Sequence, residues 1–188
     1  MAVTSHQENA VVCQCGLVEL RVDGPPIAHA ACYCRSCQEA GRLVEELPNA
    51  SPVLGSDKGT DYVLYRKDRV QCVRGAEHLR EFRLKPTSPT RRVVACCCNS
   101  AMVLDFTKGH WLTIYRGCIT GPIPSLQMRM MTVEKPEGVT LPGDVPQYRT
   151  HAGKLMWKLL RARLAMGLGA PAAKGIPTAA PELKASSI

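Results

Sequence analysis

The sequence is poor in aromatic residues and lacks both a long hydrophobic run and a segment typical of an export signal. Aromatic residues make up 5% of its 188 residues, although a total hydrophobic content of 45% is ordinary for a globular domain. The lack of eighteen consecutive apolar residues excludes a membrane-spanning helix. The first ten residues lack a basic start and an apolar stretch, so we expect no secretory signal and a cytoplasmic protein.

The chain also lacks a strongly basic body, despite its formal net charge of +8. Residues 151–188 contain six Lys or Arg residues and one Glu, so they carry +5 of that charge. Residues 1–150 are therefore only mildly basic. This is a weak signal for nucleic-acid binding, and we expect neither a nucleic acid nor a membrane as partner.

Cysteine is the residue type that the chain has in excess, with ten in all. Cys32, Cys34 and Cys37 form a C-x-C-x2-C motif, here called the three-cysteine group. Cys13 and Cys15 form a C-x-C pair upstream, and residues 96–98 are three consecutive cysteines. Thiols stay free in a reducing cytosol, so this density indicates metal binding or catalysis more than disulfides.

Short strand-like segments separated by turn residues dominate the first two thirds of the chain. They comprise residues 11–22, 27–32, 62–65, 69–73, 79–84, 92–97, 102–106 and 111–115. One short helix is predicted over residues 36–44, after the C-x-C-x2-C motif. Repeated short strands at this spacing predict a mainly β domain, for which we take residues 11–150 as the bounds. Residues 1–10 are expected to form a flexible arm.

The end of the chain has a different character. Residues 117–146 are rich in Gly and Pro and are expected to wrap the sheet as irregular chain. Residues 151–168 form an amphipathic pattern, with Leu155, Leu159, Ala162 and Met166 on one side, and predict a helix that packs on the sheet. Residues 169–188 are rich in Ala, Pro, Gly, Ser and Lys, and we expect them to be disordered.

The cysteine spacing favours zinc, which is borderline-soft and tetrahedral. Structural zinc sites use four protein ligands, whereas catalytic sites use three and keep one position open. The three-cysteine group is compact enough to share one ion. On an extended chain Cys13 and Cys15 point to the same side, and they need two further thiols, which residues 96–98 can supply. Strand alternation alone would choose Cys96 with Cys98.

Other thiols and imidazoles have no ligand spacing. Cys72 and Cys118 stand alone, and we expect both to be small core residues. His29 and His78 are single histidines, which are more often satisfied core or surface residues than ligands.

Taken together, these motifs resemble those of the glutathione-dependent formaldehyde-activating (Gfa-like) family, which includes centromere protein V. The likeness is carried by Cys13-x-Cys15-Gly16, by residues 24–26 (Gly-Pro-Pro) and by the three-cysteine group followed by Gln38 and Gly41. The chain is most similar to a bacterial branch of unknown function, through residues 59–61, 75–79 and 97–100. The resemblance covers roughly residues 11–116.

The resemblance implies an Mss4-like β-tent fold with two zinc sites. The structural site implied by the family uses the C-x-C pair and a late C-x2-C pair, which carries over to Cys13, Cys15 and Cys98. With Cys98 as the second cysteine of that late pair, the first would stand at position 95, which is Ala95. Cys97 or Cys96 must therefore serve instead. We favour Cys97 on the resemblance, against the simple strand geometry.

The second zinc implied by the family is held by the three-cysteine group, with an open position for a thiol. The family activity is formation of S-hydroxymethylglutathione, which is carbon–sulfur lyase chemistry. We therefore predict a zinc protein that acts on a small, glutathione-like thiol adduct. One alternative is a non-catalytic zinc module that binds a protein or nucleic acid through its basic C-terminal helix. The other is a thiol redox or metal-handling protein that uses residues 96–98.

Overall fold

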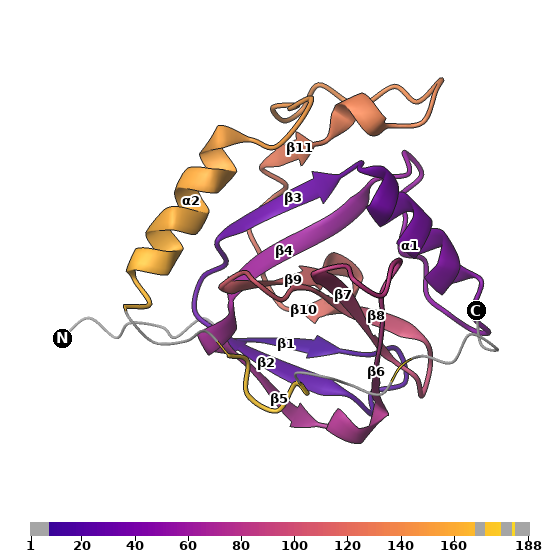
Figure 1. Ribbon diagram of the computed structural model, residues 1–188, viewed down its shortest axis with the longest axis vertical. Helices are drawn as coiled ribbons and strands as arrows, with labels where there is room; N and C mark the ends of the chain where they lie inside the picture. The colour runs from indigo at the N-terminus through magenta and orange to yellow at the C-terminus, as the bar shows by residue number, and fades with distance from the viewer. Residues whose placement is uncertain (1–7, 168–171, 178–181, 183–188) are drawn as a thin grey trace.

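A computed structural model describes residues 8–167, 172–177 and 182, and β-strands dominate these residues (Figure 1). The early elements are β1 (Glu8–Val12), β2 (Glu19–Asp23), β3 (Ala28–Cys32), α1 (Arg35–Glu45), β4 (Thr60–Arg66), β5 (Val70–Arg74) and β6 (Leu79–Phe82). The later elements are β7 (Thr90–Ala95), β8 (Ser100–Phe106), β9 (Trp111–Tyr115), β10 (Ile119–Thr120), β11 (Met128–Met130) and α2 (Gly153–Leu164). The prediction of a mainly β protein with a C-terminal helix is confirmed.

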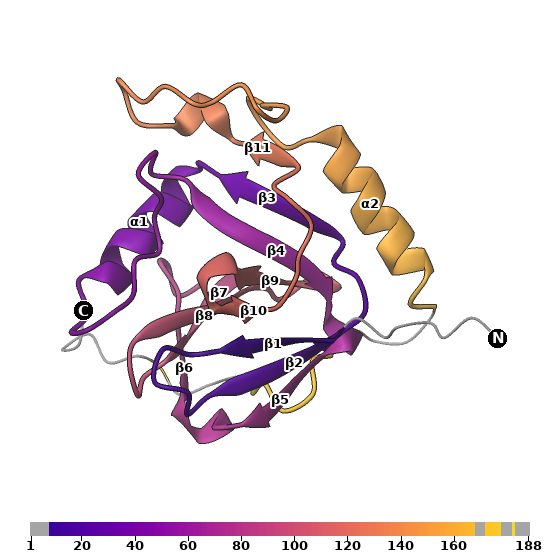
Figure 2. The same cartoon turned by 180° about the vertical axis from the view of Figure 1, so that it is seen from behind.

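The strands form two sheets. One has four strands in the order β10-β1-β2-β5, and the other has seven in the order β11-β3-β4-β9-β8-β7-β6. All pairs are antiparallel except β11 with β3, which run parallel. β10 and β11 lie within residues 117–146, so this segment, which was predicted to be irregular, contributes one strand to each sheet. Figures 1 and 2 show β1, β2 and β5 as a layer of their own, below β3 and β4.

The seven-stranded sheet is buried on both faces. In β4, Val63 and Tyr65 belong to the core shared with the four-stranded sheet, whereas Tyr62 and Leu64 belong to the core beneath the two helices. Successive side chains of a strand point to opposite faces, so a strand buried on both sides reads as a continuous apolar run. The run from Tyr62 to Tyr65 is fully consistent with this pattern.

Both helices pack on the same side of this sheet. The buried residues of α1 are Cys37, Ala40, Gly41 and Val44, which are spaced as one helix face. In α2, Leu155 and Leu159 are buried as predicted, but Ala162 is only half-buried, as is Met166 just beyond the end of the helix. The helix also begins and ends inside the predicted range 151–168, and residue 168 lies outside the described residues.

The structure differs from the sequence-based prediction at both ends of the domain. Residues 8–10 of the predicted arm are part of β1, because they pair with β2 along its whole length; residues 1–7 lie outside the described residues. Within the predicted disordered tail, residues 172–177 pack on the body: the Lys174 N–H donates to the Val70 carbonyl, and Ile176 is buried. The rest of 169–188, except residue 182, is not described.

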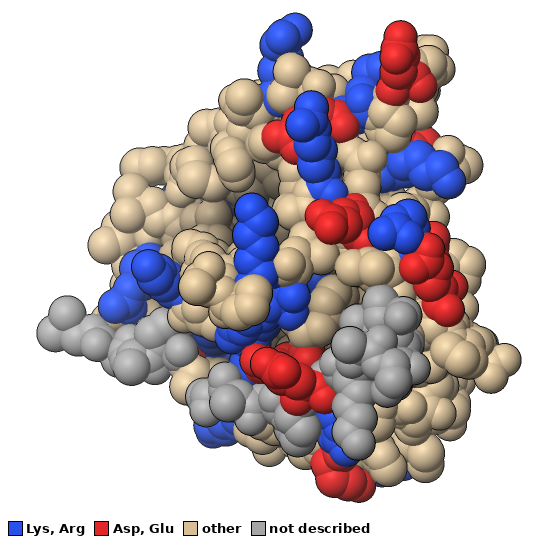
Figure 3. All heavy atoms as spheres, turned by 45° about the vertical axis from the view of Figure 1, so that its right-hand side comes forward, with Lys and Arg blue, Asp and Glu red and all other residues tan. Residues whose placement is uncertain are grey.

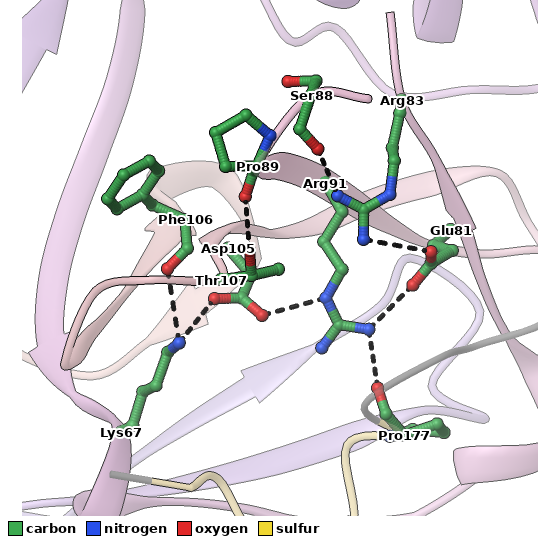
Figure 4. A network of polar contacts seen from close by, with 10 residues as sticks. All are labelled: Lys67, Glu81, Arg83, Ser88, Pro89, Arg91, Asp105, Phe106, Thr107 and Pro177. Carbon is green, nitrogen blue, oxygen red and sulfur yellow. Dashed lines mark hydrogen bonds and ion pairs between the residues drawn. The ribbon is translucent and has the colours of Figure 1, made fainter. Parts of the chain in front are cut away.

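A buried ionic network lies beneath this C-terminal segment (Figure 4). The Arg91 guanidinium donates to Asp105 Oδ2 at 2.9 Å, to Glu81 Oε2 at 2.8 Å and to the Pro177 carbonyl at 2.7 Å. Lys67 Nζ lies 2.8 Å from the other oxygen of Asp105. Composition alone predicted disorder here, because it does not show that Pro177 supplies an acceptor for a buried arginine.

The face of the molecule shown in Figure 3 carries mixed charge, with acidic side chains lying among the Lys and Arg side chains. No helix within the described parts of the chain is long and apolar enough to cross a membrane.

We expect Asp105→Asn to destabilise the protein by about 3–5 kcal/mol, because it removes the negative charge shared by buried Lys67 and Arg91. Urea unfolding monitored by circular dichroism measures this loss. The matched control is Asp68→Asn, which removes an exposed partner of Arg66 and should cost about 1 kcal/mol or less. Equal losses in the two variants would contradict the assigned role of the network.

Candidate metal centres

The three-cysteine group is assembled where β3 passes into α1. Cys32 is the last residue of β3, Cys34 is the N-cap of α1, and Cys37 is buried in the first turn of that helix. The Cys34 carbonyl accepts from the Cys37 N–H at 3.0 Å and so closes this turn. One helical turn therefore brings Cys37 back beside Cys34, and the three sulfur atoms lie within 4.8 Å of one another.

The three thiols share one negative charge. Hydrogen bonds from Cys32 and Cys37, with a further one from Ser36, lower the pKa of Cys34 to about 2. The bonds with Cys34 and Cys37, together with burial, raise the pKa of Cys32 far above its usual value. The N-terminus of α1 adds partial positive charge beside Cys34. A cation bound to all three sulfurs would allow the other two thiols to ionise as well.

Several residues other than the three cysteines hold this turn in place. Gln38 Nε2 donates to the Tyr33 and Glu134 carbonyls, and the Glu134 carboxylate accepts from the Arg35 N–H at 2.7 Å. The buried Tyr62 hydroxyl donates to Cys37 Sγ at 3.7 Å. Glu134 comes from the Gly- and Pro-rich segment, and nothing in its spacing pointed to the cysteines. Gln38 alone carried a signal, as part of the family motif.

The four-cysteine group (Cys13, Cys15, Cys97 and Cys98) lies between two chain reversals. Cys13 and Cys15 belong to the turn from β1 to β2, whereas Cys97 and Cys98 belong to the turn from β7 to β8. Gly16 follows with a φ of +77°, which a glycine adopts without strain. The Cys13 carbonyl accepts from the Gly16 N–H, and Cys13 Sγ accepts from the Val18 N–H at 3.2 Å.

The spacing of these four sulfur atoms suits a tetrahedral ion. Cys13 Sγ lies 3.6 Å from Cys15 Sγ and 3.8 Å from Cys97 Sγ, and Cys15 lies 3.4 Å from Cys97. Four thiolates about 2.3 Å from a central ion are about 3.8 Å apart. A disulfide needs about 2.05 Å between its sulfurs, and all ten cysteines are free thiols. The group can therefore hold one metal ion.

The four-cysteine group also favours ionisation of one thiol. Burial opposes the charge on Cys98, but hydrogen bonds with Ser100 and with Cys15 and Cys13 outweigh it and lower the pKa of Cys98 to about 6. Burial raises the pKa of Cys13, against the effect of the Val18 N–H. As in the three-cysteine group, several sulfurs compete for a single charge unless a cation is present.

Residues 96–98 adopt a turn, which explains which of the three joins the group. Strand alternation favoured Cys96 with Cys98, whereas the structure brings Cys97 and Cys98 together with the upstream pair. β7 ends at Ala95, the Cys98 N–H donates to the Ala95 carbonyl, and Asn99 has a φ of 54°. Consecutive residues in such a turn need not point to opposite sides, so the alternation rule does not apply.

The sequence from residue 6 to residue 114 matches the model of a family described as a family of unknown function (DUF6151). This stretch is more than half of the chain and includes all seven cysteines of the two groups. The chain belongs to this family. No curated protein matches the sequence. A solved Rhodobacter sphaeroides protein, a Northeast Structural Genomics target, is similar at 17% identity and a TM-score of 0.43, over 75% of this chain and 99% of that one.

In this DUF6151 member, the single cysteines Cys72 and Cys118 and the histidines His29 and His78 join neither cysteine group. Cys72 and Cys118 pack against the core between the sheets, as predicted. His78 is paired with Glu77 at the surface. His29 is buried, with Nδ1 2.8 Å from the Pro124 carbonyl and Nε2 2.6 Å from Asp61 Oδ1. Both partners of His29 only accept hydrogen bonds, so both ring nitrogens must donate, which favours the imidazolium.

We expect His29 to titrate above its usual pKa of about 6.5. Burial opposes the charge, but the hydrogen bonds to Asp61 and to the Pro124 carbonyl raise its pKa. The pair therefore contributes stability that is complete below about pH 6.5 and is lost as the pH rises through the higher folded-state value. Asp61→Asn should lower the pKa of His29, as measured by NMR titration of its ring protons. Asp23→Asn, which removes an exposed carboxylate elsewhere, is the control; a His29 pKa below 6.5 in the unchanged protein would refute the expectation.

Proposed function

We propose that the chain is a zinc protein with one structural and one reactive site, related to the formaldehyde-activating family and built on an Mss4-like β-tent. The reactive site forms or breaks the carbon–sulfur bond of a small thiol adduct. One observation carries this proposal: seven cysteines converge in two groups, of which one offers four sulfur donors and the other three. Free thiols in both groups suit a reducing compartment such as the cytoplasm.

The four-cysteine group has the composition of a structural zinc site. It offers four thiolates, and the backbone N–H of Val18 donates to Cys13 Sγ, as outer hydrogen bonds to metal ligands do. Its members come from the two different sheets, so an ion held here would join them. Metal binding at such a point contributes directly to the free energy of folding.

The three-cysteine group has the composition of a reactive zinc site. Within the described residues, no fourth His, Cys, Asp or Glu donor atom joins it within 4.8 Å. Three protein ligands leave one position for a substrate. The resemblance noted in the sequence, which includes Gln38 after the third cysteine, supports the assignment of this position to a thiol.

Zinc in this group would lower the pKa of a bound thiol and supply a thiolate near neutral pH. In the reaction the sulfur forms a bond to the aldehyde carbon, and the π electrons of the carbonyl move to its oxygen. That oxygen takes up the proton that the thiol has released, which gives an S-hydroxymethyl adduct. The α1 N-terminus stabilises negative charge at Cys34, and Tyr62 orients Cys37 by its hydrogen bond.

We expect the protein to contain two zinc ions per chain when purified without added metal. Cys34→Ser and Cys97→Ser should each reduce this to about one, because each removes a ligand of a different ion. Mass spectrometry of the metal content, together with X-ray absorption at the zinc edge, measures the ions and their sulfur ligands. Serine is itself a favourable N-cap, so Cys34→Ser should leave α1 intact.

Cys96→Ser is the matched control for Cys97→Ser, because it changes the neighbouring thiol, which lies outside the group. It should retain both ions. A metal content near zero in the folded protein, or equal losses in these two variants, would contradict the zinc assignment.

We further expect the zinc-loaded protein to accelerate exchange between formaldehyde and its thiol adduct. NMR exchange spectroscopy with glutathione, 2-mercaptoethanol and benzyl mercaptan in parallel measures the rate. Cys34→Ser should reduce the acceleration at least about tenfold, since it removes a ligand of the reactive ion, whereas Cys96→Ser should not. If none of the three thiols reacts faster than in buffer, the protein is a zinc module without this activity.

A further inference from the structure

An apolar cavity of about 180 Å³ adjoins the three-cysteine group. Cys32 and Cys37 form part of its lining, so it reaches two of the three thiols directly. Among the described residues that line it, none is Lys, Arg, Asp or Glu. Its polar side chains other than the cysteines are Tyr62, Thr113 and His151, and the Tyr62 hydroxyl is already bound to Cys37.

The cavity lies between the seven-stranded sheet and α2. Leu64 and Trp111 belong to its sheet side, whereas Leu155 and Met156 belong to its helix side. The α2 wall is fixed on the body by more than apolar contact. The Leu159 carbonyl lies 2.8 Å from His110 Nε2, and Lys158 Nζ donates to Gln127 Oε1 at 2.6 Å.

The size and lining of the cavity determine what it can accept. A dry cavity of about 150 Å³ with an aliphatic and aromatic lining holds a molecule the size of benzene. The cavity is partly open to solvent at Met156, so a charged group placed here would lose part of its hydration without meeting an opposite charge, which is costly. Glutathione carries two carboxylates and an ammonium, whereas a phenyl or branched alkyl group would only remove apolar surface from water.

We propose that the three-cysteine group serves a thiol, or its aldehyde adduct, whose sulfur carries an apolar substituent about the size of a benzyl group. The sulfur lies at the cysteines and the substituent fills the cavity against α2. This inference rests on the proposed function, in which the group binds a substrate thiol through zinc. It replaces the glutathione-like substrate implied by the resemblance with an apolar one.

The test uses Trp111 as a reporter, because it lines the cavity and is one of only two tryptophans. Trp157 is 60% exposed, so Trp157→Phe leaves a single reporting tryptophan at little cost. Zinc-loaded protein with this change is titrated with benzyl mercaptan, benzyl alcohol and glutathione, by fluorescence and by calorimetry. We expect benzyl mercaptan to bind at least about tenfold more tightly than glutathione, and benzyl alcohol to bind measurably without a thiol.

Met156→Glu places a carboxylate at the wall of the cavity, and Met156 is 45% exposed, so the fold tolerates it. It should weaken benzyl mercaptan binding about tenfold or more. Leu160→Glu is the matched control on the same helix, because Leu160 is 48% exposed and does not line the cavity. Equal affinity for glutathione and benzyl mercaptan, or equal weakening by the two glutamates, would overturn the inference.

The metal content of the same samples separates this inference from the proposed function. Two zinc ions per chain without any benzyl preference would leave the zinc site standing and reject the apolar substrate. Binding of benzyl alcohol by a protein with no zinc would reject the proposed reaction and, with it, the assignment of this cavity to a thiol substrate.

Discussion

Burial of β4 on both faces is the constraint on which the rest of the structure depends. Because Val63 and Tyr65 enter one core while Tyr62 and Leu64 enter the other, the chain must cover this strand twice. The four-stranded sheet covers one face, and the two helices cover the other. A slip of one residue in the register with β3 would exchange these sets and separate Tyr62 from Cys37. The three-cysteine group is thus positioned by core packing.

The two cysteine groups lie at different kinds of position in this layered structure. The three-cysteine group is local, since a strand end and one helical turn contain all its members. The four-cysteine group joins turns that are about eighty residues apart in sequence and belong to different sheets. Bringing such distant segments together costs loop-closure entropy, which the apolar core and any bound ion must offset. A metal in the four-cysteine group therefore contributes more to the free energy of folding than a metal in the three-cysteine group.

Patterns within a short stretch of sequence predicted the parts of the structure that are local. The three-cysteine motif, the helix that follows it and the strand at residues 111–115 need no distant partner to be recognised. Only the family resemblance predicted that Cys97, rather than Cys96, joins the group of Cys13. This membership depends on a turn after Ala95, which strand alternation does not anticipate.

Features that depend on distant contacts escaped prediction. Lys67, Arg91 and Asp105 look like ordinary surface residues until the fold brings their strands together. Ile176 and Pro177 belong to a stretch whose composition is typical of disorder, yet one is buried and the other accepts a hydrogen bond from Arg91. Composition reports the average behaviour of a segment, whereas a few specific contacts decide whether it packs.

The two helices make the surroundings of the three-cysteine group unequal. α1 presents its N-terminus, where the backbone dipoles favour a negative charge, and contributes two of the three sulfurs. α2 presents Leu155 and Leu159, which offer only apolar contact. A molecule that meets both surfaces must be polar or ionisable at one end and apolar at the other. A thiol satisfies the first surface by losing its proton, and its substituent must then suit the second. Under the proposed function, α2, which carries no cysteine, therefore sets the selection of substrate.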